Sequence, residues 1–176
     1  IRFEDMHDEG ERYDAIVSAQ AFHWIPQPIG FEKCASLLKK SGYLALVWNM
    51  YLYDEREEHQ KLIHLSKKYG GFADFVTKNE MKDRIHTIVS NIEDGGLYCT
   101  PMVYQEEWEI DYTADEYYGF MQTGNRFLQL PKEEKERAYR DIVHLANQFE
   151  GKIRRTYQTV LYIAQKKTEE ECSIWS

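Results

Sequence analysis

The chain has 176 residues, of which 43% are hydrophobic and 14% aromatic, and its formal net charge is -8 at pH 7. This length and composition fit one globular domain, and the negative charge excludes a nucleic-acid partner that is held mainly by phosphate contacts. No apolar run approaches the ~20 residues that span a bilayer, so no membrane partner is expected. The cysteines, at positions 34, 99 and 172, are widely separated. They indicate neither a disulfide framework nor a metal cluster, and they favour a cytoplasmic location.

The stretch 13–53 predicts a strand, a helix and a second strand. Residues 14–19 form a short apolar run, residues 29–40 place apolar side chains at helical spacing, and residues 43–48 are apolar throughout. A continuous apolar run is typical of a strand that is covered on both faces. The intervening helix favours a parallel pair, and in such units ligands lie at the carboxyl ends of the strands.

Capping boxes predict the starts of three further helices, because each pairs a polar N-cap residue with a Glu three residues later. The pairs are Asp54 with Glu57, Thr77 with Glu80, and Thr113 with Glu116. Tyr112 and Tyr117 have the spacing of a hydrophobic staple at the third start, and Pro131 opens one more helix. The segment 54–96 is therefore expected to be a helical insert.

Two later strands are predicted from side-chain pattern. Residues 102–112 alternate, with Tyr104, Trp108, Ile110 and Tyr112 on one face and acidic or amide side chains on the other, which indicates one solvated face. Residues 156–164 are rich in β-branched and aromatic side chains. The expected organisation is a single domain over 1–176: a strand–helix–strand core at 1–53, the insert at 54–96, carboxyl-terminal strands and helices at 97–167, and a tail at 168–176.

Four segments resemble the carboxyl-terminal half of class I S-adenosylmethionine-dependent methyltransferases, in particular the type 11-like small-molecule group. Ser-Ala-Gln-Ala-Phe-His-Trp at 18–24 is similar to the end of that family's fourth strand. Leu-Leu-Lys-Lys-Ser-Gly-Tyr-Leu-Ala-Leu at 37–46 is similar to the entry to the fifth, although Lys40 and Ser41 replace the family's Pro and Gly. Segments 112–117 and 157–166 resemble the regions of the sixth and seventh strands.

The resemblance implies an α/β fold with a partial Rossmann-like methyltransferase sheet. It would contain the fourth to seventh strands, with the last strand antiparallel and inserted between the fifth and sixth, together with flanking helices and the helical insert. The implied cofactor of the intact protein is S-adenosylmethionine. None of the ten glycines forms a Gly-x-Gly turn. The chain alone is therefore expected neither to bind the cofactor nor to be active.

The resemblance also assigns roles to individual residues. Cofactor-binding residues would be Phe3 and Glu4, beside the adenine, and Ala19, Gln20 and Ala21, along the methionine part. His23 is the candidate base, with a structural role at the strand end as its alternative. The candidate substrate-binding residues, each with core packing as its alternative, are Trp24, Tyr117, Tyr118 and Met121. No metal ligand is proposed.

Two functions stay open from the sequence. The first is a fragment of a methyltransferase that methylates a small molecule, the implied partner. The second is a non-enzymatic α/β interaction module. Its first strand would be left with an open apolar edge, which could form a homodimer.

Overall fold

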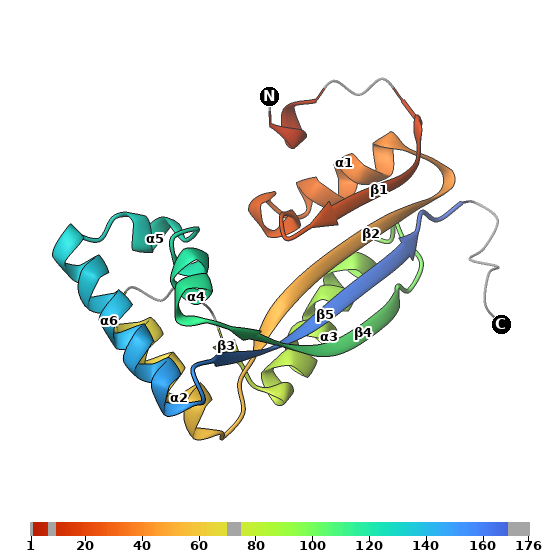
Figure 1. Ribbon diagram of the computed structural model, residues 1–176. Coiled ribbons are helices and arrows are strands. Elements are labelled where there is room, and N and C mark those ends of the chain that lie inside the picture. The colour runs from red at the N-terminus through yellow and green to blue at the C-terminus, as the bar shows by residue number, and fades with distance from the viewer. Residues whose placement is uncertain (1, 7–9, 70–74, 169–176) are drawn as a thin grey trace. The chain divides into compact units, whose positions relative to one another are not determined.

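The computed structural model describes residues 2–6, 10–69 and 75–168 (Figure 1). The elements in chain order are the 3-10 turn η1 (Phe3–Asp5), β1 (Tyr13–Ala19), the 3-10 turn η2 (Phe22–Trp24), α1 (Ile29–Leu37), β2 (Leu38–Leu52), α2 (Glu57–Lys68), β3 (Phe75–Val76), α3 (Lys78–Asp94), β4 (Met102–Tyr112), α4 (Ala114–Met121), α5 (Asn125–Leu128), α6 (Lys132–Gln148) and β5 (Ile153–Gln165). No helix among these elements is both long and apolar enough to cross a membrane.

The strands form one sheet in the order β1-β2-β5-β4, and the short β3 pairs with β2. β1 and β2 are parallel, with Ile16 opposite Leu44 and Ala19 opposite Val47. The sheet is mostly antiparallel, and in Figure 1 the arrow of β5 points opposite to that of β1. The final strand thus lies between β2 and β4, which confirms the predicted fold class.

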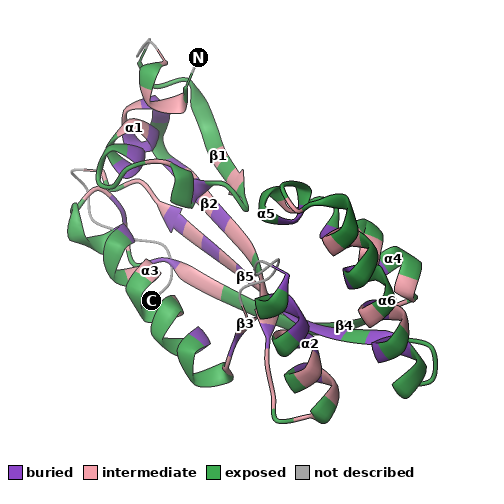
Figure 2. Cartoon of the chain, turned by 90° about the vertical axis from the view of Figure 1, so that its left-hand side faces the viewer, coloured by how far each residue is buried: buried purple, intermediate pink, exposed green. Residues whose placement is uncertain are grey.

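The chain divides into two compact units. Unit 1 comprises Ile1–Asn49, Met81–Glu106 and Thr159–Ser176, and unit 2 comprises Met50–Glu80 and Glu107–Gln158. The strands β2, β4 and β5 contribute residues to both units. Unit 2 has a core formed by residues of α2, α4, α5, α6 and the start of β5. Buried stretches of the chain are purple in Figure 2. The buried members of this core are Leu62, Leu65, Tyr69, Tyr117, Met121, Phe127, Ala138, Ile142, Leu145, Ala146 and Ile153.

Unit 1 buries one face of α1. Phe31 packs against Phe22, with ring centroids 5.0 Å apart, and its carbonyl accepts a 2.9 Å hydrogen bond from the Tyr98 hydroxyl. Cys34 is 1% exposed on the same face, and burial raises the pKa of its thiol to about 12.

Cys99 is disulfide-bonded, a bond that the cysteine spacing did not indicate.

Local signals placed most helix starts correctly. Thr113 accepts from the backbone amide of Glu116 while Glu116 accepts from that of Thr113, and the same reciprocal pair joins Thr77 to Glu80. The box predicted at Asp54 is wrong. Arg56 is the N-cap of α2, and the Asp54 carboxylate instead accepts from the Arg56 amide at 3.0 Å and its Nε at 2.7 Å. A two-residue Asp turn therefore outcompetes the cap.

The predicted dry face of β4 is also wrong over most of its length. Tyr104, Trp108 and Ile110 are 54%, 37% and 36% exposed. The alternating pattern identified the strand with its correct bounds. However, β4 is the last strand in the sheet order, and a strand at the edge of a sheet has a neighbouring strand on one side only, so its side chains are less well buried. β2 is longer than predicted, because it starts at Leu38 and continues past Trp48 to Leu52.

Candidate functional site

The carboxyl end of β1 is joined to β2 in unit 1 through Gln20. Its backbone N–H donates to the Val47 carbonyl at 3.0 Å, and its Nε2 donates to the Asn49 carbonyl at 2.9 Å. The φ of Gln20 is 54°, in the left-handed region that non-glycine residues rarely occupy, so the chain turns sharply where the strand ends. Asn49 Oδ1 in turn accepts from Thr159 Oγ1 at 2.7 Å. Hydrogen bonds therefore fix the loop after β1 to β2, and β2 to β5.

His23 follows in η2, exposed at its surface, with one ring nitrogen engaged. Trp48 Nε1 on β2 donates to His23 Nδ1 at 3.3 Å. Because the indole N–H can only donate, Nδ1 is the acceptor, and a neutral ring carries its proton on Nε2. In this arrangement His23 offers a hydrogen-bond donor. The predicted role as base requires that the bond to Trp48 break first.

The other predicted residues of unit 1 fall into two groups. Ala19, Ala21 and Trp24 are exposed beside Gln20 and His23, and the Trp24 ring, 78% exposed, lies 4.9 Å from that of His23. Phe3 and Glu4 lie in η1, a separate turn that packs against α1. The structure brings the strand-end residues together. The cofactor-binding roles of Phe3, Glu4, Ala19, Gln20 and Ala21 and the substrate-binding role of Trp24 stay predictions.

The predicted substrate residues of unit 2 lie on α4. Tyr117 and Met121 are fully buried in the core, and burial raises the pKa of Tyr117 to about 12. Tyr118 is half-buried, with its ring 5.7 Å from that of Phe127 and 5.1 Å from that of Tyr139. Of the three, Tyr117 contacts a charged group, the side chain of Arg155.

Arg155 on β5 is a buried cation, 1% exposed, and it was not among the site residues predicted from the sequence. Its guanidinium carbon lies 3.9 Å from the centroid of the Tyr51 ring. Four further rings surround it at 5.0 to 5.7 Å, and they belong to Phe75, Phe120, Tyr157 and Tyr117. We call these five rings and Arg155 the arginine box.

Hydrogen bonding satisfies only part of the guanidinium. Nη1 donates to the Tyr117 hydroxyl at a long 3.5 Å, while Nε and Nη2 are buried with no hydrogen-bond partner in the part of the chain that the structure describes. No ion pair between described residues includes Arg155. Burying an ion costs several kcal/mol, and each cation–π contact offsets about 0.5–2 kcal/mol of that. Ring faces attract the charge, but they leave the in-plane N–H groups unsatisfied, at about 1–3 kcal/mol each.

The neighbouring arginines of unit 2 are paired. Arg154 Nε and Nη2 donate to the two carboxylate oxygens of Asp111 at 2.7 and 3.1 Å, and the ion pair lowers the pKa of Asp111 to about 2. Arg56 donates to Asp54 at 2.7 Å and to Glu109 at 3.0 Å. The unpaired edge of Arg155 is thus the edge with which Arg154 binds a carboxylate.

A signal for Arg155 was present in the sequence. Strand alternation puts residues 153, 155 and 157 on one face, and Ile153 and Tyr157 are both apolar or aromatic. The predicted strand began at residue 156, so the arginine fell outside it. The box itself joins residues that are far apart in the sequence, and local pattern cannot show such contacts.

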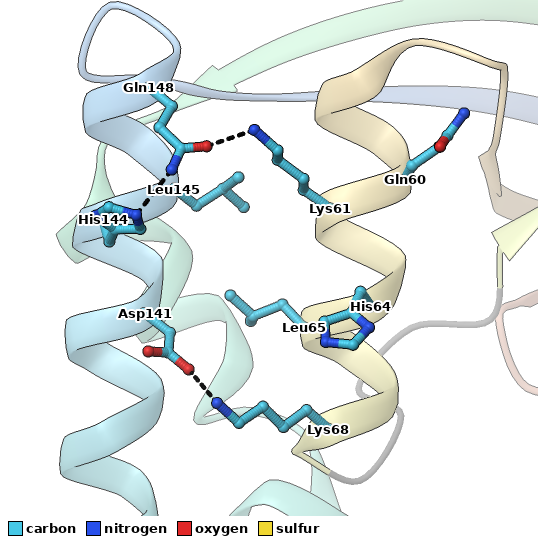
Figure 3. A pocket seen from close by; sticks show the side chains of 9 residues that line it. All are labelled: Gln60, Lys61, His64, Leu65, Lys68, Asp141, His144, Leu145 and Gln148. Carbon is cyan, nitrogen blue, oxygen red and sulfur yellow. Dashed lines mark hydrogen bonds and ion pairs between the residues drawn. The ribbon is translucent and has the colours of Figure 1, made fainter.

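A groove of about 370 Å³ lies between α2 and α6 in unit 2 (Figure 3). Its polar side chains already bind one another across the helices. Lys61 Nζ donates to Gln148 Oε1 at 2.6 Å, and Lys68 Nζ to Asp141 Oδ2 at 2.7 Å. We therefore assign it to helix packing. Among the described residues, no group of three or more His, Cys, Asp or Glu side chains is placed to hold a metal ion.

Comparison with known proteins supports the fold. An uncharacterised methyltransferase-like protein of Schizosaccharomyces pombe is 23% identical over 165 residues, which cover 90% of this chain and 60% of that protein. The crystal structure of a candidate type II methyltransferase from Anaeromyxobacter dehalogenans matches 94% of this chain and 69% of its own, with TM-score 0.55 and 14% identity. The chain has a methyltransferase fold.

A candidate methyltransferase from Bacillus halodurans gives a similar result, with TM-score 0.51, 17% identity, and coverage of 95% of this chain and 70% of that one. No protein-family model matches the chain. The chain spans 60% of the length of its fission yeast relative. At these identities the likeness establishes the fold, and the activity follows only as a proposal.

Proposed function

We propose that the chain is part of an S-adenosylmethionine-dependent methyltransferase of the type 11-like group, acting on a small molecule. The observation that carries the proposal is the loop after β1. Gln20 turns the chain at the strand end, between the small and exposed residues Ala19 and Ala21. This is the place where parallel α/β units bind ligands.

The residues present fit one side of the cofactor. Ala19, Gln20 and Ala21 would line its methionine part, and Phe3 and Glu4 would border the adenine. Bound S-adenosylmethionine supplies an activated methyl group on a sulfonium. The chain's own contribution is to hold the reactants in position, and the Nε2–H of His23 can donate a hydrogen bond to an acceptor oxygen or nitrogen.

We also propose that the glycine-rich turn of the cofactor site lies in an upstream segment, because no Gly-x-Gly occurs in this sequence. The chain alone would then be inactive. Calorimetry tests this directly: titrating S-adenosylmethionine into the chain should release no binding heat. The same titration into the protein extended by its upstream coding sequence should give saturable binding, and labelled cofactor should yield S-adenosylhomocysteine. Tight stoichiometric binding to the chain alone would contradict the proposal.

A second candidate function, an interaction module that self-associates, is favoured by the edge strand. β1 is the first strand in the sheet order, and Val17 and Tyr13 are 69% and 41% exposed on it. Exposed apolar edges pair with other chains. Light scattering should then report a dimer that Val17→Lys converts to a monomer. A monomeric wild-type chain would exclude this function.

A further inference from the structure

We propose that Arg155 recognises a carboxylate group, so that the methyl acceptor is an organic acid with an apolar body. The inference rests on the proposed function, because it names the substrate class of that enzyme. It starts from two buried nitrogens, Nε and Nη2 of a side chain that is 1% exposed, which have no hydrogen-bond partner among the described residues.

The chemistry of the ligand follows from the unpaired edge. Nε–H and Nη2–H lie in one plane and point the same way, which matches the two oxygens of a carboxylate. The chain uses this geometry one residue earlier, where Arg154 binds both oxygens of Asp111. Arg155 is the one cation within the box as far as the described residues define it. A single negative charge therefore balances the site, which favours a carboxylate over a doubly charged phosphate.

The apolar body follows from the rings around the guanidinium. Five aromatic rings surround it, and the closest, that of Tyr51, lies face-on at 3.9 Å. Tyr51, Phe75 and Phe120 are only partly buried, whereas Tyr117 and Tyr157 are 0% and 5% exposed. The partly exposed rings are the side from which a ligand can enter, since rotation of one ring would uncover the cation. A planar aromatic group or an aliphatic chain of the ligand can then pack in the place that the rotated ring occupied.

Two other arginines of unit 2 carry carboxylate partners. Arg56 has Asp54 and Glu109, and Arg154 has Asp111. Unlike these two arginines, Arg155 has an unpaired edge, which is a preorganised binding group. The rings hold the guanidinium in place, and the ligand supplies the missing lone pairs.

Calorimetric titration of the chain with benzoate and hexanoate, and with benzamide and hexanamide as uncharged controls, tests the proposal near neutral pH. The acids should bind and the amides should not. Arg155→Met should weaken acid binding about tenfold or more, because two charge-assisted hydrogen bonds are lost. Arg155→Lys should be intermediate, since an ammonium keeps the charge but not the planar fork. Arg154→Met is the matched control and should bind like the wild type.

A second measurement needs no variant at position 155. The Nε–H resonance of Arg155 in the wild-type chain should move downfield when benzoate is added and stay in place with benzamide. Equal affinity of Arg155→Met and wild type, equal affinity of acid and amide, or no binding of either acid would overturn the proposal. Neither assay contains S-adenosylmethionine or measures methyl transfer, so their failure is distinguishable from failure of the proposed function.

Discussion

The strand end of unit 1 and the arginine box of unit 2 present opposite kinds of polar site. At the strand end, Gln20 and His23 are exposed, and the hydrogen bonds described above involve both side chains. In the box, Arg155 is buried among rings, and two of its nitrogens have no hydrogen-bond partner within residues 2–6, 10–69 and 75–168. Exposed groups can exchange their bonds with water at little cost, whereas a buried unpaired group cannot. The box is therefore where stability and binding should be most strongly coupled.

Removing the buried ring of the box should have the largest effect on stability. Tyr117 is 0% exposed and contacts the rings of Tyr112 and Phe120 at 5.8 Å. Tyr117→Ala should lower the free energy of unfolding by about 3–5 kcal/mol, measured by urea denaturation. Trp24→Ala, at the 78% exposed strand-end ring, should change it by less than about 0.5 kcal/mol. Equal losses of unfolding free energy in Tyr117→Ala and Trp24→Ala would show that the two regions do not differ in packing.

The capping box of α4 should have the next largest effect, because it fixes the start of the helix that carries Tyr117. Thr113 accepts a hydrogen bond from the Glu116 amide at 3.2 Å. Thr113→Ala should cost about 1 kcal/mol in the same denaturation assay. Thr113→Ser keeps the hydroxyl and should restore most of the loss, and a Ser variant as unstable as the Ala variant would argue against the cap.

His59 should give unit 2 a dependence of stability on pH. It is 1% exposed, and burial lowers its pKa despite the opposing charge of Asp54; Arg56, Glu58 and Glu109 also act on it. Because the folded pKa lies below the unfolded value of about 6.5, the unfolded chain binds the proton more tightly. Stability is therefore full above that pH and falls as the pH drops toward the folded pKa.

The measurement for His59 is the urea midpoint between about pH 7 and pH 5, above the range where carboxylates titrate. His59→Gln should flatten the decline. His64→Gln, an exposed histidine on the same helix, should leave the slope unchanged. A wild-type midpoint that is constant across this range would contradict the assignment.

The smallest effect should follow from Trp48→Phe, which removes the N–H that donates to His23 Nδ1. Nitrogen NMR of the wild type should show the tautomer protonated on Nε2. The variant should show a mixture of tautomers with only a small change in stability, because His23 is exposed and Phe keeps an aromatic ring beside Tyr162. A wild-type ring protonated on Nδ1 would exclude the donor role proposed for His23.

The sequence could predict what local contacts determine. Local signals, which lie within a few residues of one another, predicted the strand–helix–strand segment of β1, α1 and β2. They also predicted the helix caps at Thr77 and Thr113. Asp54 is an exception: its carboxylate binds Arg56 and His59, which lie within five residues, and Arg56 also binds the distant Glu109. The exposed side chains of β4 depend on which strand ends the sheet, a property of topology that alternation does not encode.

The candidate site was predictable to a similar degree. Position at a strand end identified Gln20 and His23, but the donor that fixes the His23 ring comes from Trp48 on another strand. Tyr117 was selected for its aromatic character on α4, and its charged neighbour was not foreseen. Tyr51, Phe75 and Arg155 meet across a long stretch of chain, and only the folded structure shows that contact.

The most direct test of the account is the free energy of unfolding of Arg155→Met without ligand, beside Arg154→Met. If the buried guanidinium is unsatisfied, Met should fill its volume without the desolvation cost, and stability should rise by about 1–4 kcal/mol. Arg154→Met should lower stability slightly, because Asp111 loses its two bonds to Arg154 and keeps the longer contact with Lys152. A clear loss of stability in Arg155→Met, comparable to that of Tyr117→Ala, would contradict the account and make Arg155 a structural residue.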